Sequence, residues 1–186
     1  MSWEHELFAL FDDLEGQAAV AWEDEREAEL ADRARSEYAA VTLASRLMAS
    51  RGRAVALDLP HVGRLEGRLA RVGEGWCLLS GNGQDWVVPL RAVSGVRGMS
   101  ERSVPEVAWS PVDRLGLRSA LRRIADAGDR CLVHLADGSR HEAYVGRVGA
   151  DFAECRDAAG VAFLVPYDAL VAVQRRDDQD VPGSVG

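Results

Sequence analysis

The sequence contains no lysine, so all 22 of its basic residues are arginines. It has only three cysteines, Cys77, Cys131 and Cys155, which lack CxxC spacing and stand in apolar stretches. We therefore expect buried thiols in a reducing compartment rather than disulfides or a zinc site. No apolar run reaches the length of a membrane span, and the N-terminus is acidic rather than basic. These absences argue against a signal peptide and a membrane anchor, and they predict a cytoplasmic protein.

Motifs of catalysis and of cofactor binding are also missing. No GxSxG occurs, and the glycine-rich segments 73–75 and 80–83 connect predicted strands, whereas a phosphate-binding loop leads into a helix. His134 and His141 flank a turn, with Glu142 nearby, but we expect exposed strand residues here rather than metal ligands. The sequence therefore predicts a protein that is not an enzyme and that holds no cofactor and no metal.

The negative charge of the chain is concentrated in its first 50 residues. They contain 12 acidic residues and four arginines, whereas the remainder has 18 of each. Residues 3–33 have no proline and one glycine, and their composition favours a helix. One stripe of this helix is apolar and consists of Trp3, Leu7, Leu10 and Phe11. The stripe either packs on the rest of the molecule or docks in the groove of a partner protein.

Residues 53–97 and 130–174 are two copies of one pattern. The sequence RVGEGW at 71–76 recurs as RVGADF at 147–152, and VPLRAV at 88–93 recurs as VPYDAL at 165–170. Each copy predicts five short strands, because short apolar runs alternate with glycine and turn residues. Modules of this size bury little surface on their own, so we expect the two to pack together in one compact body.

A helix is predicted over residues 112–127, between the two copies. Asp113 stands near its start and Gly128 follows its end. One face of this helix is basic and consists of Arg114, Arg118 and Arg122, with Arg123 beside it. We expect this face to be solvated or paired within the molecule; the alternative is that it contacts DNA.

The repeated pattern resembles the Sm or Sm-like fold, in which a helix precedes five short, bent strands. In the second copy, the sequence VHLADG at 133–138 resembles the first motif of that fold. In the first copy, Val96-Arg97-Gly98 resembles the hydrophobic-Arg-Gly signature with which Sm-like rings line an RNA-binding pore. The resemblance implies an α+β fold with an N-terminal helix and two tandem, small, bent five-stranded Sm-like (SH3-like) β-barrels, each preceded by a helix. It also implies pairing through edge strands, either as a closed pseudo-dimer within the chain or as part of a larger homo-oligomeric ring, and RNA contacts by Arg97, Gly98, Asp137 and Gly138.

Over nearly its full length the chain is similar to a group of uncharacterised proteins of actinobacteria, the high-GC Gram-positive bacteria. The segments that carry this likeness are FALFDDLE at 8–15, RLGLR at 114–118 and LVPY at 164–167. Members are often labelled automatically as Fis-family transcriptional regulators. That type of DNA-binding domain ends in a basic helix-turn-helix, whereas this chain ends in predicted strands and an acidic tail.

The sequence thus predicts four segments. Residues 1–35 form an acidic helix, 36–104 the first Sm-like module, 105–176 the second module with its leading helix, and 177–186 a disordered tail. Within the first module, residues 36–50 favour a short strand or linker followed by a short helix.

Three functional hypotheses follow. The leading one is a non-enzymatic binding or regulatory protein that binds a partner protein or RNA. The second is a transcription-linked regulator that contacts DNA through the helix bearing Arg114, Arg118 and Arg122. The third is a protein scaffold that uses its N-terminal helix. The acidic pI, near 5.0, makes DNA the less favoured nucleic acid.

Overall fold

The computed structural model describes residues 3–176, and within the first helix it describes only some of the side chains. The predicted disordered tail, 177–186, lies outside the described residues. The chain divides into two compact units, Met1–Val41 and Thr42–Gly186. Helix α1 belongs to the first unit, and the described part of the second unit contains two further α-helices and ten strands.

Helix α1 spans Trp3–Ala39, so the helix predicted over 3–33 is present and is longer than expected. Residues 36–39 continue this helix, and the prediction of a strand or linker from residue 36 is wrong. These four residues include no helix breaker, and extending an existing helix costs little. The chain leaves the helix before Thr42, whose extended backbone and side chain cap the next helix. Among the residues that the structure describes, none of the helices has both the length and the apolarity needed to cross a membrane.

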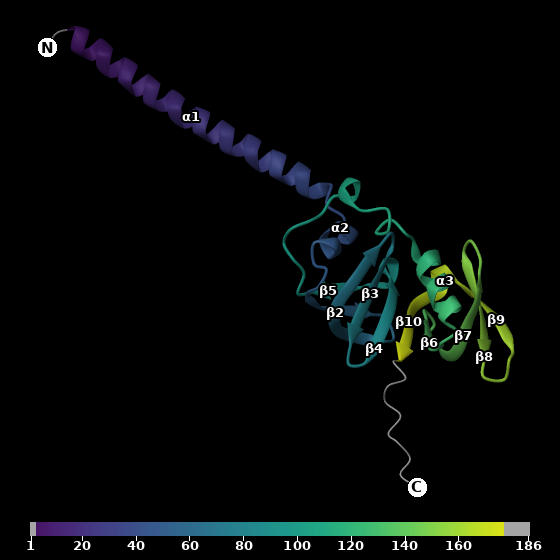
Figure 1. Ribbon diagram of the computed structural model, residues 1–186. Helices are drawn as coiled ribbons and strands as arrows, with labels where there is room; N and C mark the ends of the chain where they lie inside the picture. The colour runs from purple at the N-terminus through teal and green to yellow at the C-terminus, as the bar shows by residue number, and fades with distance from the viewer. Residues whose placement is uncertain (1–2, 177–186) are drawn as a thin grey trace. The chain divides into compact units, whose positions relative to one another are not determined.

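The second unit is an α+β structure built on one antiparallel sheet of ten strands, which does not close on itself (Figure 1). The strands are β1 (Ala54–Leu59), β2 (Gly63–Gly73), β3 (Trp76–Gly81), β4 (Gln84–Pro89), β5 (Gly95–Arg97), β6 (Arg130–Leu135), β7 (Arg140–Val148), β8 (Phe152–Asp157), β9 (Ala162–Pro166) and β10 (Leu170–Arg176). Short 3-10 helices are η1 (Leu90–Ala92), η2 (Glu106–Ala108) and η3 (Tyr167–Ala169). Each predicted strand of the two copies is present.

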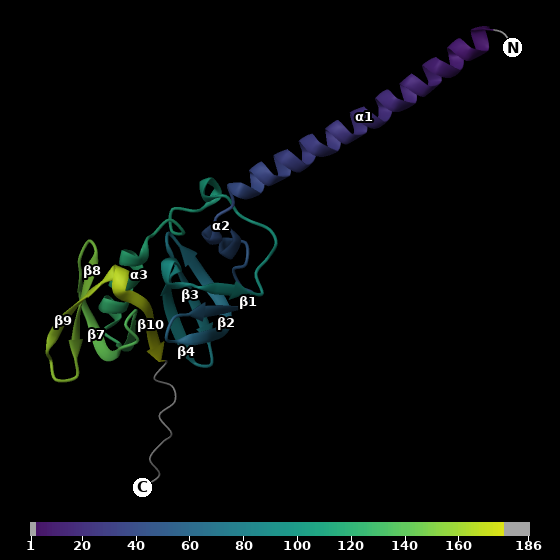
Figure 2. The same ribbon diagram turned by 180° about the vertical axis from the view of Figure 1, so that it is seen from behind.

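The strand order repeats across the sheet. It runs β5-β1-β2-β3-β4 through the first copy and continues β10-β6-β7-β8-β9 through the second. In both halves the last strand of the copy therefore lies beside the first strand. The two halves meet where β4 pairs with β10, a neighbourhood that is visible from both sides of the molecule (Figures 1 and 2). We call this pair of strands the repeat junction.

Helices α2 (Leu43–Met48) and α3 (Leu117–Ala127) each precede the first strand of one copy. Helix α3 starts later than the predicted position 112. The segment before it forms a turn, in which the Ser110 hydroxyl donates to Asp113. Gly116 then stands at the helix N-cap with an extended backbone. Glycine is a poor helix former, so the helix starts only after it. The helix ends at Gly128, in the left-handed region, as predicted.

The second unit has two apolar cores, and each contains residues from both halves of the sheet. Trp76 and Val87 of the first copy belong to the core beneath α3, together with Val173. Val171 and Ala172 of β10 belong to the other core, with Leu57 and Leu79 among its members. Neither half buries its apolar side chains alone, and this explains why the two copies fold as one compact unit.

Candidate binding surface at the sheet edges and the repeat junction

The repeat junction uses a strand from each copy. Val173 on β10 lies opposite Val87 on β4, and Gln174 lies opposite Trp86. On its other side β10 pairs with β6, the first strand of its own copy. Strands β5 and β9 end the sheet, and within the described part of the chain each has a strand neighbour on one side only. We call β5 and β9 the free edge strands.

Equivalent positions differ in exposure between the junction and the free edge. Val87 on β4 is 8% exposed, because β10 and α3 cover it. Its equivalent in the second copy is Leu164 on β9, which is 60% exposed. Val161, just before β9, is 61% exposed. An edge strand that presents apolar side chains and unpaired backbone groups is a surface on which another strand can pair.

Arg97 lies in β5 and is committed to an ion pair. Its guanidinium contacts the carboxylate of Asp58 on β1, and the Nε of Arg64 lies 2.9 Å from the other oxygen of the same carboxylate. The hydrogen bond from Arg64, followed by that from Arg97, lowers the pKa of Asp58. The Arg97 side chain remains 59% exposed, so one side of it still faces solvent.

Gly98 has a structural role at the end of β5. Its φ of +79° lies in the left-handed region, and a Cβ placed on it would come within 2.9 Å of the Ala54 carbonyl oxygen. Only glycine fits this close approach to β1. The Val96-Arg97-Gly98 sequence is therefore explained in part by the way in which β5 ends.

The predicted turn at Asp137 and Gly138 meets a turn of the first copy. The Asp137 carboxylate accepts hydrogen bonds from the hydroxyl and the backbone N–H of Ser139, at 2.6 and 2.8 Å, and these lower its pKa. A Cβ placed on Gly138 would lie 3.4 Å from the His61 ring. His61, at φ 59°, is in the turn between β1 and β2, shortly after Asp58. The structure thus places the turns 59–63 and 136–139 side by side, and the Asp58 carboxylate with its partner Arg97 lies just before the first of them.

His134 and Gln174 form a neutral pair at the repeat junction. The His134 Nε2 lies 3.2 Å from the Gln174 Oε1, and the Gln174 amide donates to Gln84 of β4 at 2.8 Å. The His134 ring also packs on Trp86, with 5.3 Å between centroids. His134 is 4% exposed, so the expectation of an exposed residue is wrong. Burial lowers its pKa and keeps the imidazole neutral.

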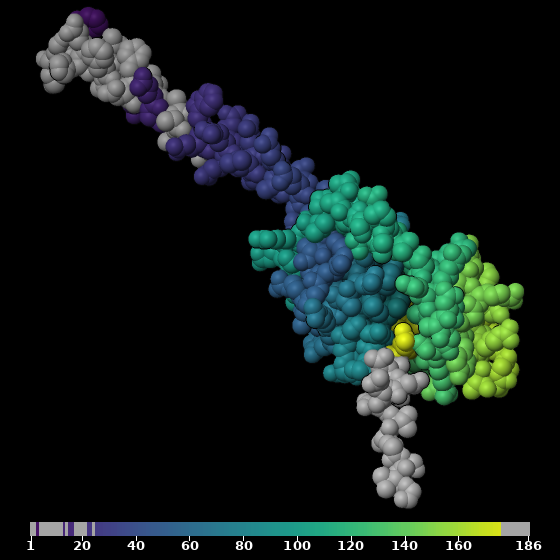
Figure 3. Space-filling model, in the orientation of Figure 1, coloured from purple at the N-terminus to yellow at the C-terminus, as the bar shows by residue number. Residues whose placement is uncertain are grey.

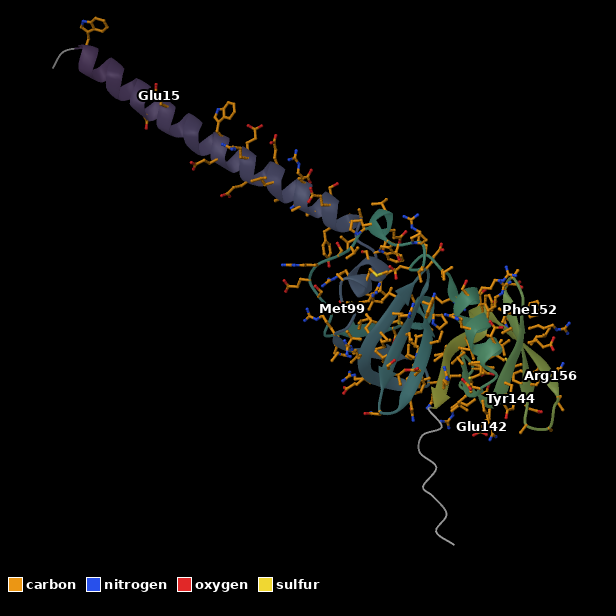
Figure 4. The ribbon with its side chains drawn as sticks, in the orientation of Figure 1. Glu15, Met99, Glu142, Tyr144, Phe152 and Arg156 are labelled. Atoms are coloured by element: carbon orange, nitrogen blue, oxygen red, sulfur yellow. The ribbon has the colours of Figure 1, made fainter. Side chains whose placement is uncertain are left out.

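His141 and Glu142 are not placed to share a ligand with His134. Val133 lies opposite His141, so His134 points to the other face of the sheet. His141 packs instead on Phe163, with 5.2 Å between ring centroids. Glu142 pairs with Arg130. It lies at the opposite end of the β7–β8 hairpin from Phe152 (Figure 4). In the part of the chain that is described, no group of three His, Cys, Asp or Glu side chains is arranged to hold a metal ion.

The predicted basic face of the 112–127 helix is not continuous. Arg114 precedes α3, and its guanidinium donates to the carbonyls of Glu106 and Val107 at 3.4 and 3.3 Å. Arg118 and Arg122 are exposed on α3 near Tyr167, whose pKa is raised chiefly by burial of its hydroxyl and is lowered in part by these two cations. Neither arginine has an ion-pair partner among residues 3–176 as described. The basic face of α3 thus consists of Arg118 and Arg122, with Arg123 alongside.

The three cysteines are buried and free, as predicted. Burial raises the pKa of Cys77 to about 12 and, as the largest cause, raises those of Cys131 and Cys155 to about 11. A thiol with such a pKa carries almost no thiolate near pH 7, and the thiolate is the nucleophile. These side chains therefore serve as core residues.

The N-terminal stripe can be followed only in part. Trp3 is 70% exposed, and the backbones of Leu7, Leu10 and Phe11 lie in α1. The side chains of these three residues lie outside the described residues. Trp22, Leu30 and Tyr38, further along α1, are each more than 60% exposed.

The structure places Gly138 beside His61 of the β1–β2 turn, and it pairs Arg97 with Asp58 shortly before that turn. Sequence reasoning missed His61, Asp58 and the buried His134–Gln174 pair. The repeat contained a signal for the last of these, because Asp58 and His134 occupy equivalent positions in the two copies, as Arg97 and Gln174 do.

A scan against protein-family models finds no match to this chain, and a search among curated proteins finds none either.

Proposed function

We propose that this chain is a non-enzymatic, Sm-like binding protein, made of two tandem Sm-like barrels, that assembles through its free edge strands and binds a partner protein or RNA on the assembled surface. The observation that carries the proposal is the repeat junction, where the chain joins its own two halves by pairing β4 with β10. The equivalents of these strands are β9 and β5, and each has a free side within the described chain. A second molecule of the protein can form the same antiparallel strand pairing with them.

The junction register defines the register expected between copies. Val173 lies opposite Val87 within the chain. By the equivalence of the repeats, Val96 of one protein molecule lies opposite Leu164 of the next molecule. This pairing covers Leu164, which is 60% exposed in the single chain. Because the two surfaces differ, the contact is head to tail and closes into a ring or continues as a filament.

The 3-10 helices beside the junction support the same pairing. Arg91 of η1 and Asp168 of η3 occupy equivalent positions, and at the junction their side chains form an ion pair of 3.6 Å. When two protein molecules join head to tail, Arg91 beside β5 of one molecule faces Asp168 beside β9 of the other. The pair is exposed, so it contributes specificity more than affinity.

Disulfide trapping tests this assembly. The variants Val96→Cys and Leu164→Cys are mixed and oxidised, because opposite residues on paired strands are within disulfide reach. The proposal predicts a covalent dimer in the mixture, and no dimer when Val107→Cys, an 86% exposed position away from the edges, replaces Leu164→Cys. The native thiols are buried and do not compete. Equal trapping by both pairs would reject edge pairing.

RNA is the ligand favoured for the surface around Arg97 and the two turns, since the Arg97 side chain is 59% exposed in the single chain. The test is fluorescence anisotropy of the whole chain with a short mixed-sequence RNA and a matched DNA duplex across a range of salt. Binding to RNA should weaken with salt and be lost in Arg97→Glu. Arg102→Glu is the matched control, since this exposed arginine lies between β5 and η2 and carries the same change of charge. RNA binding that survives Arg97→Glu would exclude this surface.

A second candidate is a transcription-linked regulator that binds DNA through α3. Its support is that Arg118 and Arg122 are exposed and have no ion-pair partner in the described chain. In the same anisotropy experiment, this function predicts duplex binding that is lost in Arg118→Glu and Arg122→Glu and is unchanged in Arg97→Glu.

A third candidate is a protein scaffold that recruits its partner through α1. Its support is the exposure of Trp3, Trp22 and Leu30 on a helix that forms a unit of its own. This function predicts that removal of residues 1–33 abolishes partner binding, whereas the charge changes on β5 and α3 leave it intact.

A further inference from the structure

A pocket of about 270 Å³ lies in the second unit, between the sheet and α3. Its floor is formed by strands β2, β3, β4 and β10, and α3 together with the loop before it forms the opposite wall. In the space-filling view, atoms of β10 are visible between the first copy and α3 (Figure 3). None of the lining residues lies on β5 or β9, so the pocket does not depend on assembly of the chain.

The floor of the pocket is apolar. Leu78, Val87 and Val173 are opposite one another on three neighbouring strands and therefore point to the same face of the sheet. Ile124 of α3 and Leu115 of the preceding loop add to the apolar lining from the opposite wall. The Trp76 indole donates to the Leu115 carbonyl at 2.7 Å and fixes this loop against the sheet.

The charged groups of the pocket leave a positive excess. Arg175 is held by Asp129 at 2.6 Å. Of the two carboxylates in the lining, Asp85 accepts a hydrogen bond from the Ser80 hydroxyl, and Asp113 pairs with Arg51 at 2.9 Å, outside the pocket. Two further arginines line the pocket without an ion-pair partner among the described residues; they are Arg71 and Arg123.

The second copy shows what the first has lost. Arg147 is the equivalent of Arg71, and it pairs with the carboxylate of Glu154 at 2.8 Å. The position equivalent to Glu154 in the first copy is Leu78, which lies opposite Arg71. The exchange of a carboxylate for an apolar side chain leaves the Arg71 guanidinium uncompensated, beside an apolar floor.

We infer that this pocket binds a small organic anion, with its apolar body against Leu78, Val87 and Ile124 and its carboxylate, sulfonate or phosphate group between Arg71 and Arg123. Guanidinium groups bind such oxyanions through charge-assisted hydrogen bonds. An apolar pocket with a few converging polar groups is the usual form of a small-molecule site. The volume suits a molecule with one or two rings.

Isothermal titration of the full chain with naphthalene-2-sulfonate tests the inference. Wild type should bind this anion, and Arg71→Gln and Arg123→Gln should each weaken binding by about 10-fold, since each removes a charge-assisted hydrogen bond. Arg118→Gln, on the exposed side of the same helix, is the control and should bind like wild type. Sulfate and 2-naphthalenemethanol, which each supply half of the ligand, should bind at least 10-fold more weakly than the sulfonate.

The variant Leu78→Glu restores to the first copy the carboxylate that Glu154 supplies in the second. It should abolish binding of the sulfonate, because the new carboxylate pairs with Arg71. Its thermal unfolding is measured in parallel, and the two Gln variants, at surface side chains, carry the test if it fails to fold. Absence of sulfonate binding to wild type, equal affinity for the uncharged analogue, or unchanged binding in both Gln variants would overturn the inference.

Discussion

The two copies place different chemistry on one framework. The pair of positions that joins the first strand of a copy to its last strand holds Asp58 and Arg97 in the first copy and His134 and Gln174 in the second. In the single chain the first pair borders solvent beside a free edge strand, and it is ionic. The second pair is buried in the repeat junction, and it is neutral. The comparison indicates that burial, rather than the strand framework, decides which side chains these positions accept, because an isolated buried charge is costly.

Exchanging the residues of the two copies should have the largest effect at the junction. His134→Asp places a carboxylate at a 4% exposed position whose neighbours are Gln174 and Trp86. We expect it to reduce the free energy of unfolding by about 3 kcal/mol, measured by urea denaturation. The reciprocal Asp58→His at the free edge should leave the urea midpoint close to that of wild type. Equal losses in both variants would contradict the comparison.

The ends of the two equivalent strands offer the next test. Gly98 ends β5 in the left-handed region, whereas the equivalent residue, Arg175, continues β10. Gly98→Ala should cost about 2 kcal/mol, because a left-handed alanine is strained and its Cβ would crowd the Ala54 carbonyl. Gly63→Ala, at φ +90° with no atom within 4 Å of the added Cβ, should cost about half as much. Thermal or urea unfolding of both variants separates crowding from backbone strain.

A smaller effect is expected from the neutral pair as the pH falls. Because burial lowers the pKa of His134 below its usual 6.5, the unfolded chain binds a proton more readily than the folded one. The stability that depends on neutral His134 is therefore complete above about pH 6.5 and declines as the pH falls below it. Urea unfolding from pH 7.5 to 5 should show this decline in wild type and a flatter profile in His134→Gln. Identical profiles would show that His134 is not the titrating group.

The smallest effect is expected from the ionic pair. Arg64 and Arg97 lower the pKa of Asp58 below its usual 3.8, so the stability it provides is present above that pH and is lost as the pH falls through the lowered value. The pair borders solvent, and salt should screen it. Thermal unfolding of Asp58→Asn at low and high salt should differ from wild type only at low salt and above pH 4. A difference that persists in high salt would point to a packing role instead.

Most of the elements that the sequence predicted correctly belong to the two repeats. Ten strands and the end of α3 at Gly128 followed from short apolar runs and turn residues, which act locally. Two helix boundaries did not. Ser36–Ala39 has mixed propensity and simply continues α1, while Gly116 delays the start of α3 and moves Arg114 out of it. At the first boundary the preceding helix determined the conformation of residues 36–39, and at the second a single glycine determined where α3 begins.

The candidate site was predicted less well, because it depends on long-range pairing. Arg97 and the Asp137–Gly138 turn are far apart in the sequence, and only the structure shows that the first pairs with Asp58, before the β1–β2 turn, and that the second lies beside His61 of that turn. The burial of His134 also follows from tertiary structure, since β10 and β4 enclose it. A polar residue at one strand position looks the same in the sequence on a free edge and inside a junction, and no local pattern distinguishes the two.

Sedimentation equilibrium of the full chain over a range of concentrations, beside Leu164→Asp and Val107→Asp, tests assembly through the free edge strands most directly. We predict that wild type and Val107→Asp associate into dimers or larger multiples of the chain mass, and that Leu164→Asp stays monomeric, because its carboxylate would be buried against β5. A monomeric wild type at every concentration, or association that Leu164→Asp does not change, would contradict the account.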